Sequence, residues 1–168
     1  MESGGIKNGK QALRTRMRAM CKALDAAQRE ALSRLACEQL MGIAAFAEAS
    51  CILGYRAMPH ECDPACALAW AREKGARIAY PRCVGERNLE LYVPRDENAF
   101  VRGRYGIWEP DPVRCARIGA GELDCIVVPG LAFDAACMRL GQGAGYYDTL
   151  LAGEGAFAAA IAFSCVRR

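Results

Sequence analysis

Apolar residues near the start of the chain recur with the spacing of a helix. One apolar stripe follows the positions i, i+4, i+7 and i+11, which predicts an amphipathic helix over the first 24 residues. Its members are Leu13, Met17, Met20 and Leu24. Asp25 then has the residue type of a helix N-cap, and leucines follow at positions 32, 35 and 40. We therefore expect two consecutive helices over the first 40 residues.

Short apolar runs in the rest of the chain predict strands. The expected strands cover residues 51–55, 77–83 (with Pro81 as a stop signal), 89–93, 123–130 and 156–166. The pair Asp63-Pro64 predicts the N-cap and first residue of a helix that ends near Gly75. A further helix is expected from Gly145 to Leu151. Between 96 and 121 little periodicity is visible, and we expect mostly an ordered loop there.

The strand expected over 123–130 indicates the fold class. Its sequence, LDCIVVPG, is a continuous apolar run without polar alternation. Such a run is typical of a parallel strand that is buried on both faces of a sheet. Helices that alternate with buried strands favour an α/β layered domain. The whole chain, 168 residues, has the length of one domain.

Composition and charge exclude several classes of protein. With 53% apolar and 24% charged residues, the chain is not a disordered tail, and it has no apolar run of about 18 residues that would cross a membrane. The N-terminal MESGGIKNGK lacks the apolar core of a signal peptide, so we expect a cytoplasmic protein. The net charge is only +3, and no aromatic residues are interleaved with the basic ones. We therefore expect neither a membrane nor a nucleic-acid partner. We also expect a monomer.

The ten cysteines are expected to be reduced thiols, because no secretory signal is visible. No C-x-x-C pair occurs, and one cluster, His60, Cys62 and Cys66, has residue types that bind zinc. Structural zinc sites usually need four ligands with closer pairing. We therefore favour packing near the start of a helix for Cys62 and Cys66, with a metal site as the alternative.

A second stripe on the first helix is basic. Lys10, Arg14 and Arg18 follow one another at i, i+4 and i+8, where like charges repel by a few tenths of a kcal/mol per pair, roughly. The stripe is therefore either a solvated face or a surface that meets an anion. Spacing alone leaves both interpretations open.

The segment from Arg139 to Asp148 carries the most chemical information. It follows the best strand, precedes a predicted helix, and has glycines at 141, 143 and 145. Such glycines can turn tightly and bring backbone N–H groups close to an anion, with the start of the helix adding positive charge. Arg139 is suited to bind a phosphate and Asp148 to bind Mg²⁺. On glycine spacing alone, a purely structural loop is the alternative.

Four segments together resemble the 5-formyltetrahydrofolate cyclo-ligase family, also called methenyltetrahydrofolate synthetases. The longest is PGLAFD (129–134) followed by RLGQGAGYYD (139–148). The others are Lys10-x-x-x-Arg14, the segment YRAMPHECD (55–63) and the turn YGIWEP (105–110), which occur in the family's order. The resemblance extends from residue 10 to about 165.

This resemblance implies a compact three-layer α/β domain whose central sheet is mixed, mostly parallel and flanked by helices. It also implies ATP- and Mg²⁺-dependent conversion of 5-formyltetrahydrofolate, a reduced folate, to 5,10-methenyltetrahydrofolate, with release of ADP and phosphate. Phosphoryl transfer of this kind needs positioning and charge neutralisation more than a covalent protein nucleophile.

The site residues that the resemblance implies fall into three groups. Those expected at the ATP phosphates are Lys10, Arg14, Arg139, Leu140, Gly141, Gln142, Gly143, Ala144, Gly145 and Tyr147. Those expected at the folate are Arg56, Glu61 and Tyr146, and Asp148 is the expected metal ligand. Arg139, Tyr146 and Tyr147 are the expected catalytic residues. The resemblance thus favours anion binding for Lys10 and Arg14.

The chain also departs from the family pattern. Cys137 stands where the family usually has glycine, so a positive φ there would strain the loop by about 1 kcal/mol or more. Family members usually continue into a final strand with a second acidic metal-site residue, whereas this sequence stops at Arg168. The expectation is therefore one domain over residues 1–168 without that strand.

Two alternative functions stay open. One is a catalytically weak relative that only binds nucleotide or folate. The other is a nucleic-acid-binding module, which the 18 arginines suggest.

Overall fold

The computed structural model of the chain describes residues 3–96, 98–153 and 155–163. Its helices are α1 (Ser3–Ala23), α2 (Ala26–Met41), α3 (Ala44–Ala47), α4 (Ala65–Glu73) and α5 (Tyr146–Leu151), with 3₁₀ turns at Arg104–Gly106 and Ala120–Glu122. The first five strands are β1 (Cys51–Leu53), β2 (Arg77–Val84), β3 (Asn88–Pro94), β4 (Phe100–Arg102) and β5 (Trp108–Pro110). The remaining strands are β6 (Cys115–Ile118), β7 (Cys125–Pro129), β8 (Ala132–Phe133), β9 (Arg139–Leu140) and β10 (Phe157–Ile161).

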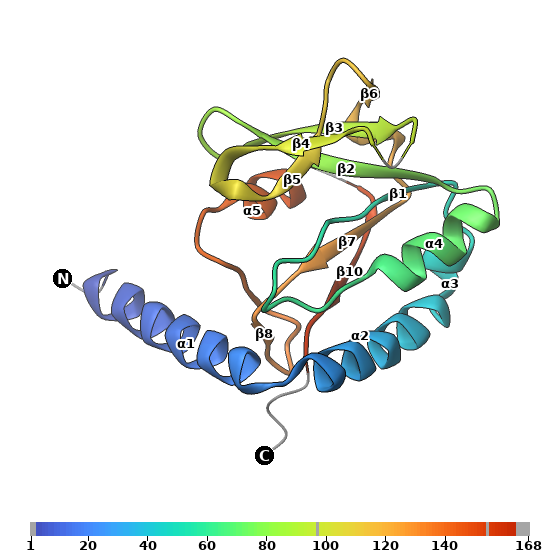
Figure 1. Cartoon of the computed structure of the whole chain (residues 1–168). Helices are drawn as coiled ribbons and strands as arrows, with labels where there is room; N and C mark the ends of the chain where they lie inside the picture. The colour runs from blue at the N-terminus through green and yellow to red at the C-terminus, as the bar shows by residue number, and fades with distance from the viewer. Residues whose placement is uncertain (1–2, 97, 154, 164–168) are drawn as a thin grey trace.

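The centre of the fold is a mixed six-stranded sheet in the order β10-β7-β1-β2-β3-β6 (Figure 1). The neighbours β10, β7, β1 and β2 pair in parallel, and β3 pairs antiparallel with both β2 and β6. Five of the six strands therefore point in one direction. The predicted α/β fold with a mixed, mostly parallel sheet is confirmed.

Apolar side chains cover both faces of this sheet. On one face, Ile52 and Val127 belong to a core cluster with Leu40 of α2, Phe46 of α3 and Leu68 of α4. On the other face, Leu53, Ile126 and Val128 cluster with partly buried residues of α5, including Leu150. Neighbouring residues of β1 and β7 alternate between the two clusters, as successive side chains of a strand must. The continuous apolar run over 123–130 is thus explained by burial on both faces.

Most of the predicted elements are present. Asp25 caps α2 through a capping box, in which its carboxylate accepts the N–H of Gln28 at 2.8 Å and the Gln28 side chain accepts the N–H of Asp25 at 3.0 Å. Helix α4 begins at Ala65, with Pro64 rather than Asp63 at the N-cap position; the Asp63 carboxylate still accepts the N–H of Ala65 at 3.0 Å. Of the strand expected over 156–166, the structure shows Phe157–Ile161, and residues 164–166 lie outside the described residues.

Two expectations about strands were wrong. Pro81 does not stop β2, which continues to Val84. Strand β1 pairs only with residues 77–79 of β2, so Pro81 lies where β2 has lost its neighbour on that side and a missing N–H is tolerated. The region 96–121 is not mostly loop, because it holds β4, β5 and β6. These strands are only three or four residues long, too short to show a clear period.

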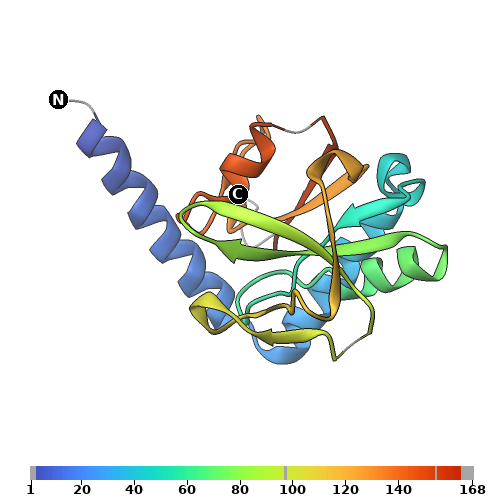
Figure 2. The ribbon, with the colours of Figure 1, turned by 90° about the horizontal axis from the view of Figure 1, so that it is seen from above.

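The topology gathers several segments at one edge of the sheet. The chain leaves β1 at Leu53 and β7 at Pro129, and the carboxyl ends of parallel strands lie at the same edge. This edge is where α/β folds generally bind ligands. Helix α1 runs beside it and extends away from the body of the molecule (Figures 1 and 2). Among the helices that the structure describes, none has the length and apolar character needed to cross a bilayer.

Candidate active site

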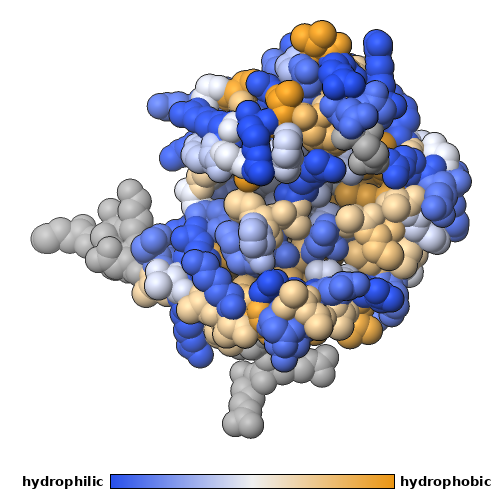
Figure 3. All heavy atoms as spheres, viewed as in Figure 1, coloured by the Kyte–Doolittle hydropathy of each residue, from blue (hydrophilic) through white to orange (hydrophobic). Residues whose placement is uncertain are grey.

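A cleft of about 480 Å³ opens at this edge of the sheet. Its walls come from α1, the segment after β1, the strand β2, the turn between β4 and β5, and the glycine-containing loop after β9. Every predicted site residue lines it: Lys10, Arg14, Arg56, Glu61, Arg139, Leu140, Gly141, Gln142, Gly143, Ala144, Gly145, Tyr146, Tyr147 and Asp148. Figure 3 shows the molecule hollowed between its upper strands and the helical part below. Residues up to 138 positions apart in the sequence, from Lys10 to Asp148, therefore share one site.

The loop between β9 and α5, residues 141–145, is here called the glycine loop. Gly143 has a φ of +107° and Gly145 a φ of +80°, values that side-chain-bearing residues rarely adopt. A Cβ atom at Gly143 would also lie 3.4 Å from the guanidinium carbon of Arg14. Glycine at 143 thus allows both the turn and the close approach of a basic side chain.

Two arginines of α1 donate hydrogen bonds to the glycine loop. Arg14 Nε donates to the carbonyl of Gly141 at 3.0 Å. Arg18 donates three times to Gln142: from Nε and Nη2 to the side-chain oxygen at 3.1 and 2.9 Å, and from Nη2 to the backbone carbonyl at 3.0 Å. The basic stripe therefore faces the cleft, and anion binding by these residues stays a prediction.

Arg139 and Asp148 occupy the two ends of the glycine loop and form an ion pair with each other. Arg139 Nη1 also donates to the carbonyl of Pro129 at 3.0 Å, and its side chain is only 14% exposed. The guanidinium lies against Gly141, where a Cβ atom would come within 2.6 Å of it. The carboxylate of Asp148 remains open to solvent, with 75% of the side chain exposed.

Glu61, in the segment after β1, is a buried carboxylate with 8% exposure. One of its oxygens accepts the backbone N–H of Met58 at 3.0 Å, and the other accepts a hydrogen bond from the Gln142 amide nitrogen at 3.1 Å. The same amide nitrogen lies 3.0 Å from Nε2 of His60. Nearby, the guanidinium of Arg56 stacks 4.1 Å above the ring centre of Phe100.

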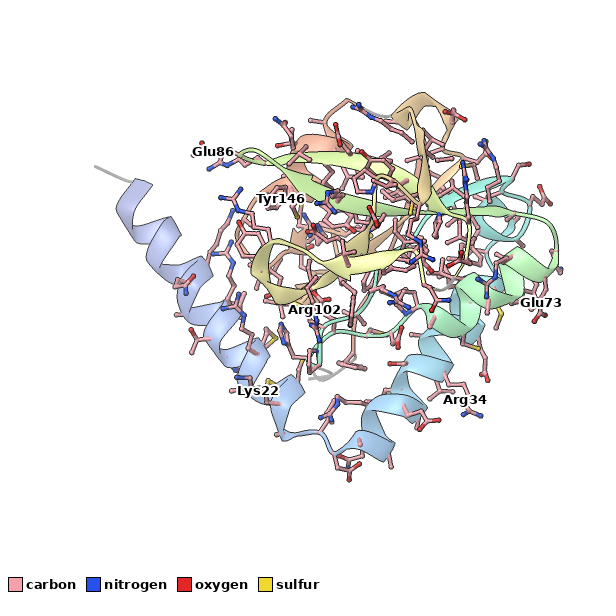
Figure 4. The ribbon with its side chains drawn as sticks, turned by 45° about the horizontal axis from the view of Figure 1, so that its top comes forward. Lys22, Arg34, Glu73, Glu86, Arg102 and Tyr146 are labelled. Atoms are coloured by element: carbon pink, nitrogen blue, oxygen red, sulfur yellow. The ribbon has the colours of Figure 1, made fainter. Side chains whose placement is uncertain are left out.

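Two tyrosines follow the glycine loop in different environments. The Tyr146 hydroxyl lies 3.3 Å from that of Tyr105, and this hydrogen bond, with some burial, raises the pKa of Tyr146 to about 12. Figure 4 shows Tyr146 between the β2–β3 hairpin that carries Glu86 and the hairpin that carries Arg102, on the side that faces α1. The Tyr147 hydroxyl is buried and has no hydrogen-bond partner among the described residues, and burial raises its pKa. A buried hydroxyl without a partner fits a group that hydrogen-bonds a ligand.

Sequence reasoning missed several residues of the cleft. Tyr105, Ile107 and Trp108 line it from the turn between β4 and β5; they belong to the family segment 105–110, but no site role was assigned to them. Arg18 was seen in the basic stripe but was not assigned to the site, although its i+4 spacing from Arg14 was the available signal. Cys83 also lines the cleft, and burial together with Glu109 raises its pKa to about 11. This thiol is therefore protonated at neutral pH.

The zinc alternative for His60, Cys62 and Cys66 finds no support. Cys62 is buried in the core, whereas Cys66 is exposed on α4. Across the described ranges, no three His, Cys, Asp or Glu side chains come together in a way that could hold a metal ion. Mg²⁺ differs from zinc in this respect, because it commonly binds one or two carboxylates together with substrate phosphates and water. A single exposed carboxylate such as Asp148 fits that kind of binding.

The chain is similar to known proteins of one family. The sequence profile described as the 5-formyltetrahydrofolate cyclo-ligase family matches residues 6–165. The chain belongs to this family. The sequence-based recognition is thereby confirmed, and the relatives that match are named as enzymes.

Curated family members show moderate identity. A probable 5-formyltetrahydrofolate cyclo-ligase of Schizosaccharomyces pombe is 32% identical over 119 residues, which are 68% of this chain and 58% of that protein. The 5-formyltetrahydrofolate cyclo-ligase of Mus musculus is 26% identical over 152 residues, 87% of this chain and 75% of that protein. With the Mycolicibacterium smegmatis family member, the match covers 48% of that protein. The chain thus spans between about half and three quarters of these relatives.

Solved structures confirm the fold. The 5,10-methenyltetrahydrofolate synthetase of Aquifex aeolicus superposes with a TM-score of 0.79 at 28% identity, covering 95% of this chain and 82% of that one. The 5,10-methenyltetrahydrofolate synthetase of Mycoplasma pneumoniae gives a TM-score of 0.72 at 18% identity, covering 91% and 84%. The second likeness concerns the fold alone.

Proposed function

We propose that the protein catalyses the ATP- and Mg²⁺-dependent cyclisation of 5-formyltetrahydrofolate to 5,10-methenyltetrahydrofolate, with release of ADP and phosphate. The observation that carries this proposal is the convergence of four separate family segments on one cleft. Lys10 and Arg14, the segment 55–63, the turn at 105–110 and the glycine loop all contribute to its lining. Membership of the family supports the same reaction.

The glycine loop and α1 are the proposed nucleotide side of the cleft. Lys10, Arg14 and Arg139 bring positive charge to the loop, and glycine at 143, with its positive φ, leaves the backbone there free of a side chain. A triphosphate carries several negative charges, and charge-assisted hydrogen bonds from such groups are the strong ones. The backbone from Leu140 to Gly145 lines the cleft between these cations. The charge and the shape of this wall therefore both fit phosphate groups.

Asp148 is the proposed Mg²⁺ ligand. Its carboxylate is exposed at the end of the glycine loop, where it can reach both metal and phosphate oxygens. Mg²⁺, when bound, neutralises charge on the phosphates during transfer. Before the metal binds, the ion pair with Arg139 holds the carboxylate in place.

The segment after β1, which carries Arg56 and Glu61, is the proposed folate side of the cleft. Glu61 presents a carboxylate suited to the N–H donors of a pterin ring, and it is buried, which strengthens its hydrogen bonds. Arg56 and Tyr146 line the same cleft and are the other residues proposed to contact the folate. The aromatic residues Tyr105 and Trp108 add a flat apolar surface for the ring system.

The reaction needs an activated formyl oxygen, because this oxygen is a poor leaving group. Transfer of the γ-phosphoryl group from ATP to the oxygen releases ADP and gives a phosphate ester. N10 of the folate then attacks the carbon, N10 gives up its proton to the departing phosphate or to water, and the C–O bond breaks to release phosphate. The residues of the cleft hold both substrates in line and offset the negative charge. The Arg139 guanidinium lies 5.8 Å from the ring centre of Tyr147. The buried Tyr147 hydroxyl, which has no hydrogen-bond partner among the described residues, is the proposed donor to a ligand oxygen.

The proposal treats the protein as a cytoplasmic, single-domain monomer without a nucleic-acid partner. The nine cysteines within the described ranges are all free thiols, which supports a reducing compartment. The test of the function is to mix the protein with Mg-ATP and 5-formyltetrahydrofolate and to follow the absorbance of methenyltetrahydrofolate. Folded protein that forms no product would overturn the proposal.

A further inference from the structure

The side chain of Gln142 hydrogen-bonds to two separate elements that line the cleft, α1 and the segment after β1. Its oxygen accepts two hydrogen bonds from Arg18 of α1, and its nitrogen lies within hydrogen-bond distance of Glu61 and His60 in the segment after β1. The residues that it connects lie 124, 82 and 81 positions away in the sequence. Gln142 is therefore a bridge between the helix α1 and the segment that follows β1.

Arg18 determines which way the amide of Gln142 points. A guanidinium has only donors, so the amide atom that faces it must be the oxygen. The amide NH₂ group is then directed at Glu61 and His60, where it donates at 3.1 Å to a carboxylate oxygen. Because the amide nitrogen is a donor, Nε2 of His60 accepts, which places the imidazole proton on Nδ1.

The same bridge fixes the orientation of the Glu61 carboxylate. Its two oxygens are held separately, one by the N–H of Met58 and one by the amide of Gln142. A carboxylate oxygen accepts more than one hydrogen bond, so both oxygens keep acceptor capacity for a ligand in the cleft. The carboxylate is buried, and a second conformation would leave one of the two N–H groups of the Gln142 amide without an acceptor, which is costly at a buried site.

We propose that Gln142 is a positioning residue for Glu61, and that Arg18 imposes the amide orientation that this requires. The proposal rests on the proposed function, in which Glu61 binds the pterin ring. Arg18 then contributes to recognition of the folate through Gln142, from a helix whose other basic residues face the glycine loop. Gln142 was expected from the resemblance only as part of the nucleotide-binding loop.

Two substitutions at Gln142 test the proposal because they remove different hydrogen bonds of its side chain. Gln142→Leu removes both the acceptor for Arg18 and the donor to Glu61. Gln142→Glu keeps an acceptor for Arg18 but replaces the donor with a second carboxylate oxygen, where the native separation from Glu61 is 3.1 Å. We expect Gln142→Leu to weaken 5-formyltetrahydrofolate binding about tenfold and Gln142→Glu about a hundredfold, because like charges repel at this distance.

Arg18 supplies an independent set of variants. Arg18→Met should also weaken folate binding about tenfold, and Arg18→Lys, which keeps one donor, should recover part of the loss. Arg16→Met is the matched control, since Arg16 is exposed on the same helix. This control should bind folate as the unchanged protein does.

The measurement is isothermal titration of the full chain and each variant with 5-formyltetrahydrofolate and, separately, with a non-hydrolysable Mg-ATP analogue. The expected result is a loss that is several times larger for folate than for the nucleotide, with KM for folate raised and kcat less affected. The inference is overturned if Gln142→Glu binds folate as the unchanged protein does. It is also overturned if every variant loses both ligands equally, which is what a merely structural role predicts. If the unchanged protein itself binds no folate, the proposed function fails, and this inference fails with it.

Discussion

Arg139 and Asp148 form an ion pair that closes the glycine loop at its base. The Arg139 guanidinium also donates to the carbonyl of Pro129, at the end of the central strand β7. The loop is therefore tied to the sheet through one nearly buried arginine. The two groups proposed to act on phosphate and metal hold each other in position before any ligand binds.

Replacing Asp148 by asparagine separates the metal role from the structural one. The Asp148 side chain is 75% exposed, and exposed ion pairs contribute only about 0–1 kcal/mol to stability. We therefore expect Asp148→Asn to keep its thermal unfolding midpoint within a few degrees while losing Mg²⁺-dependent ATP consumption about a hundredfold or more. Unchanged ATP consumption over a Mg²⁺ titration would refute the assigned role.

Gly143 tests whether the shape of the loop matters for nucleotide binding. Gly143→Ala places a side chain at a φ of +107° and 3.4 Å from the Arg14 guanidinium, at a cost of about 1–2 kcal/mol. We expect affinity for a non-hydrolysable ATP analogue to fall about tenfold, measured by calorimetry. Gly121→Ala is the control, because a Cβ atom there meets nothing within 4 Å and its φ is not positive. Equal affinity in the two variants would contradict this account of the loop.

Tyr147 should show opposite effects on stability and activity. Its buried hydroxyl has no partner in the part of the chain that the structure describes, so Tyr147→Phe removes an unsatisfied polar group. The unfolding midpoint should stay the same or rise, by about 2–4 °C for each kcal/mol recovered. Turnover should fall about tenfold, because the hydroxyl is proposed to donate to a ligand.

Tyr55→Phe is the contrasting variant. It loses the hydrogen bond that the Tyr55 hydroxyl donates to the carbonyl of Cys62, so its thermal unfolding midpoint should fall. A Tyr147→Phe protein with full activity would remove Tyr147 from the catalytic set.

Alkaline pH should destabilise the fold through its buried thiols. Burial raises the pKa of Cys62 to about 12 and that of Cys125 to about 11, from an ordinary value of 9.0. The folded thiols stay protonated while those of the unfolded chain ionise, so this contribution to stability is complete below pH 9 and is lost as the pH rises toward 11–12. Melting curves from pH 7 to 10.5 should therefore show a midpoint that falls above about pH 9. Cys125→Ala should show a shallower fall, and a midpoint that stays constant to pH 10.5 would contradict the assignment.

The central layers of the fold follow from local sequence signals. Asp25 caps α2 because its side chain and that of Gln28 satisfy each other's backbone, a contact that spans three residues. Strand β7 is buried on both faces, and its unbroken apolar run shows this directly. The hairpin of β4 and β5 depends instead on pairing between short segments without a clear pattern, as between Val101 and Glu109. No local pattern therefore predicts that these two strands pair.

The site was predictable to the extent that its residues form motifs. Every residue assigned from the family segments lines the cleft, because the carboxyl ends of β1 and β7 bring those segments together. The assignments of individual roles remain predictions. What no local pattern could supply is the pairing of side chains across the cleft. Arg18 and Gln142 are 124 residues apart, and neither residue type indicates that the other is its partner.

The most direct test of the central claim follows both products of the reaction in one experiment. The protein is mixed with Mg-ATP and 5-formyltetrahydrofolate, and methenyltetrahydrofolate is measured by its absorbance while ADP is measured in a coupled assay. The account predicts equal amounts of the two products, with neither formed when Mg²⁺ is chelated. Folded protein that binds both substrates but forms no methenyltetrahydrofolate, or that releases ADP without it, would contradict the account.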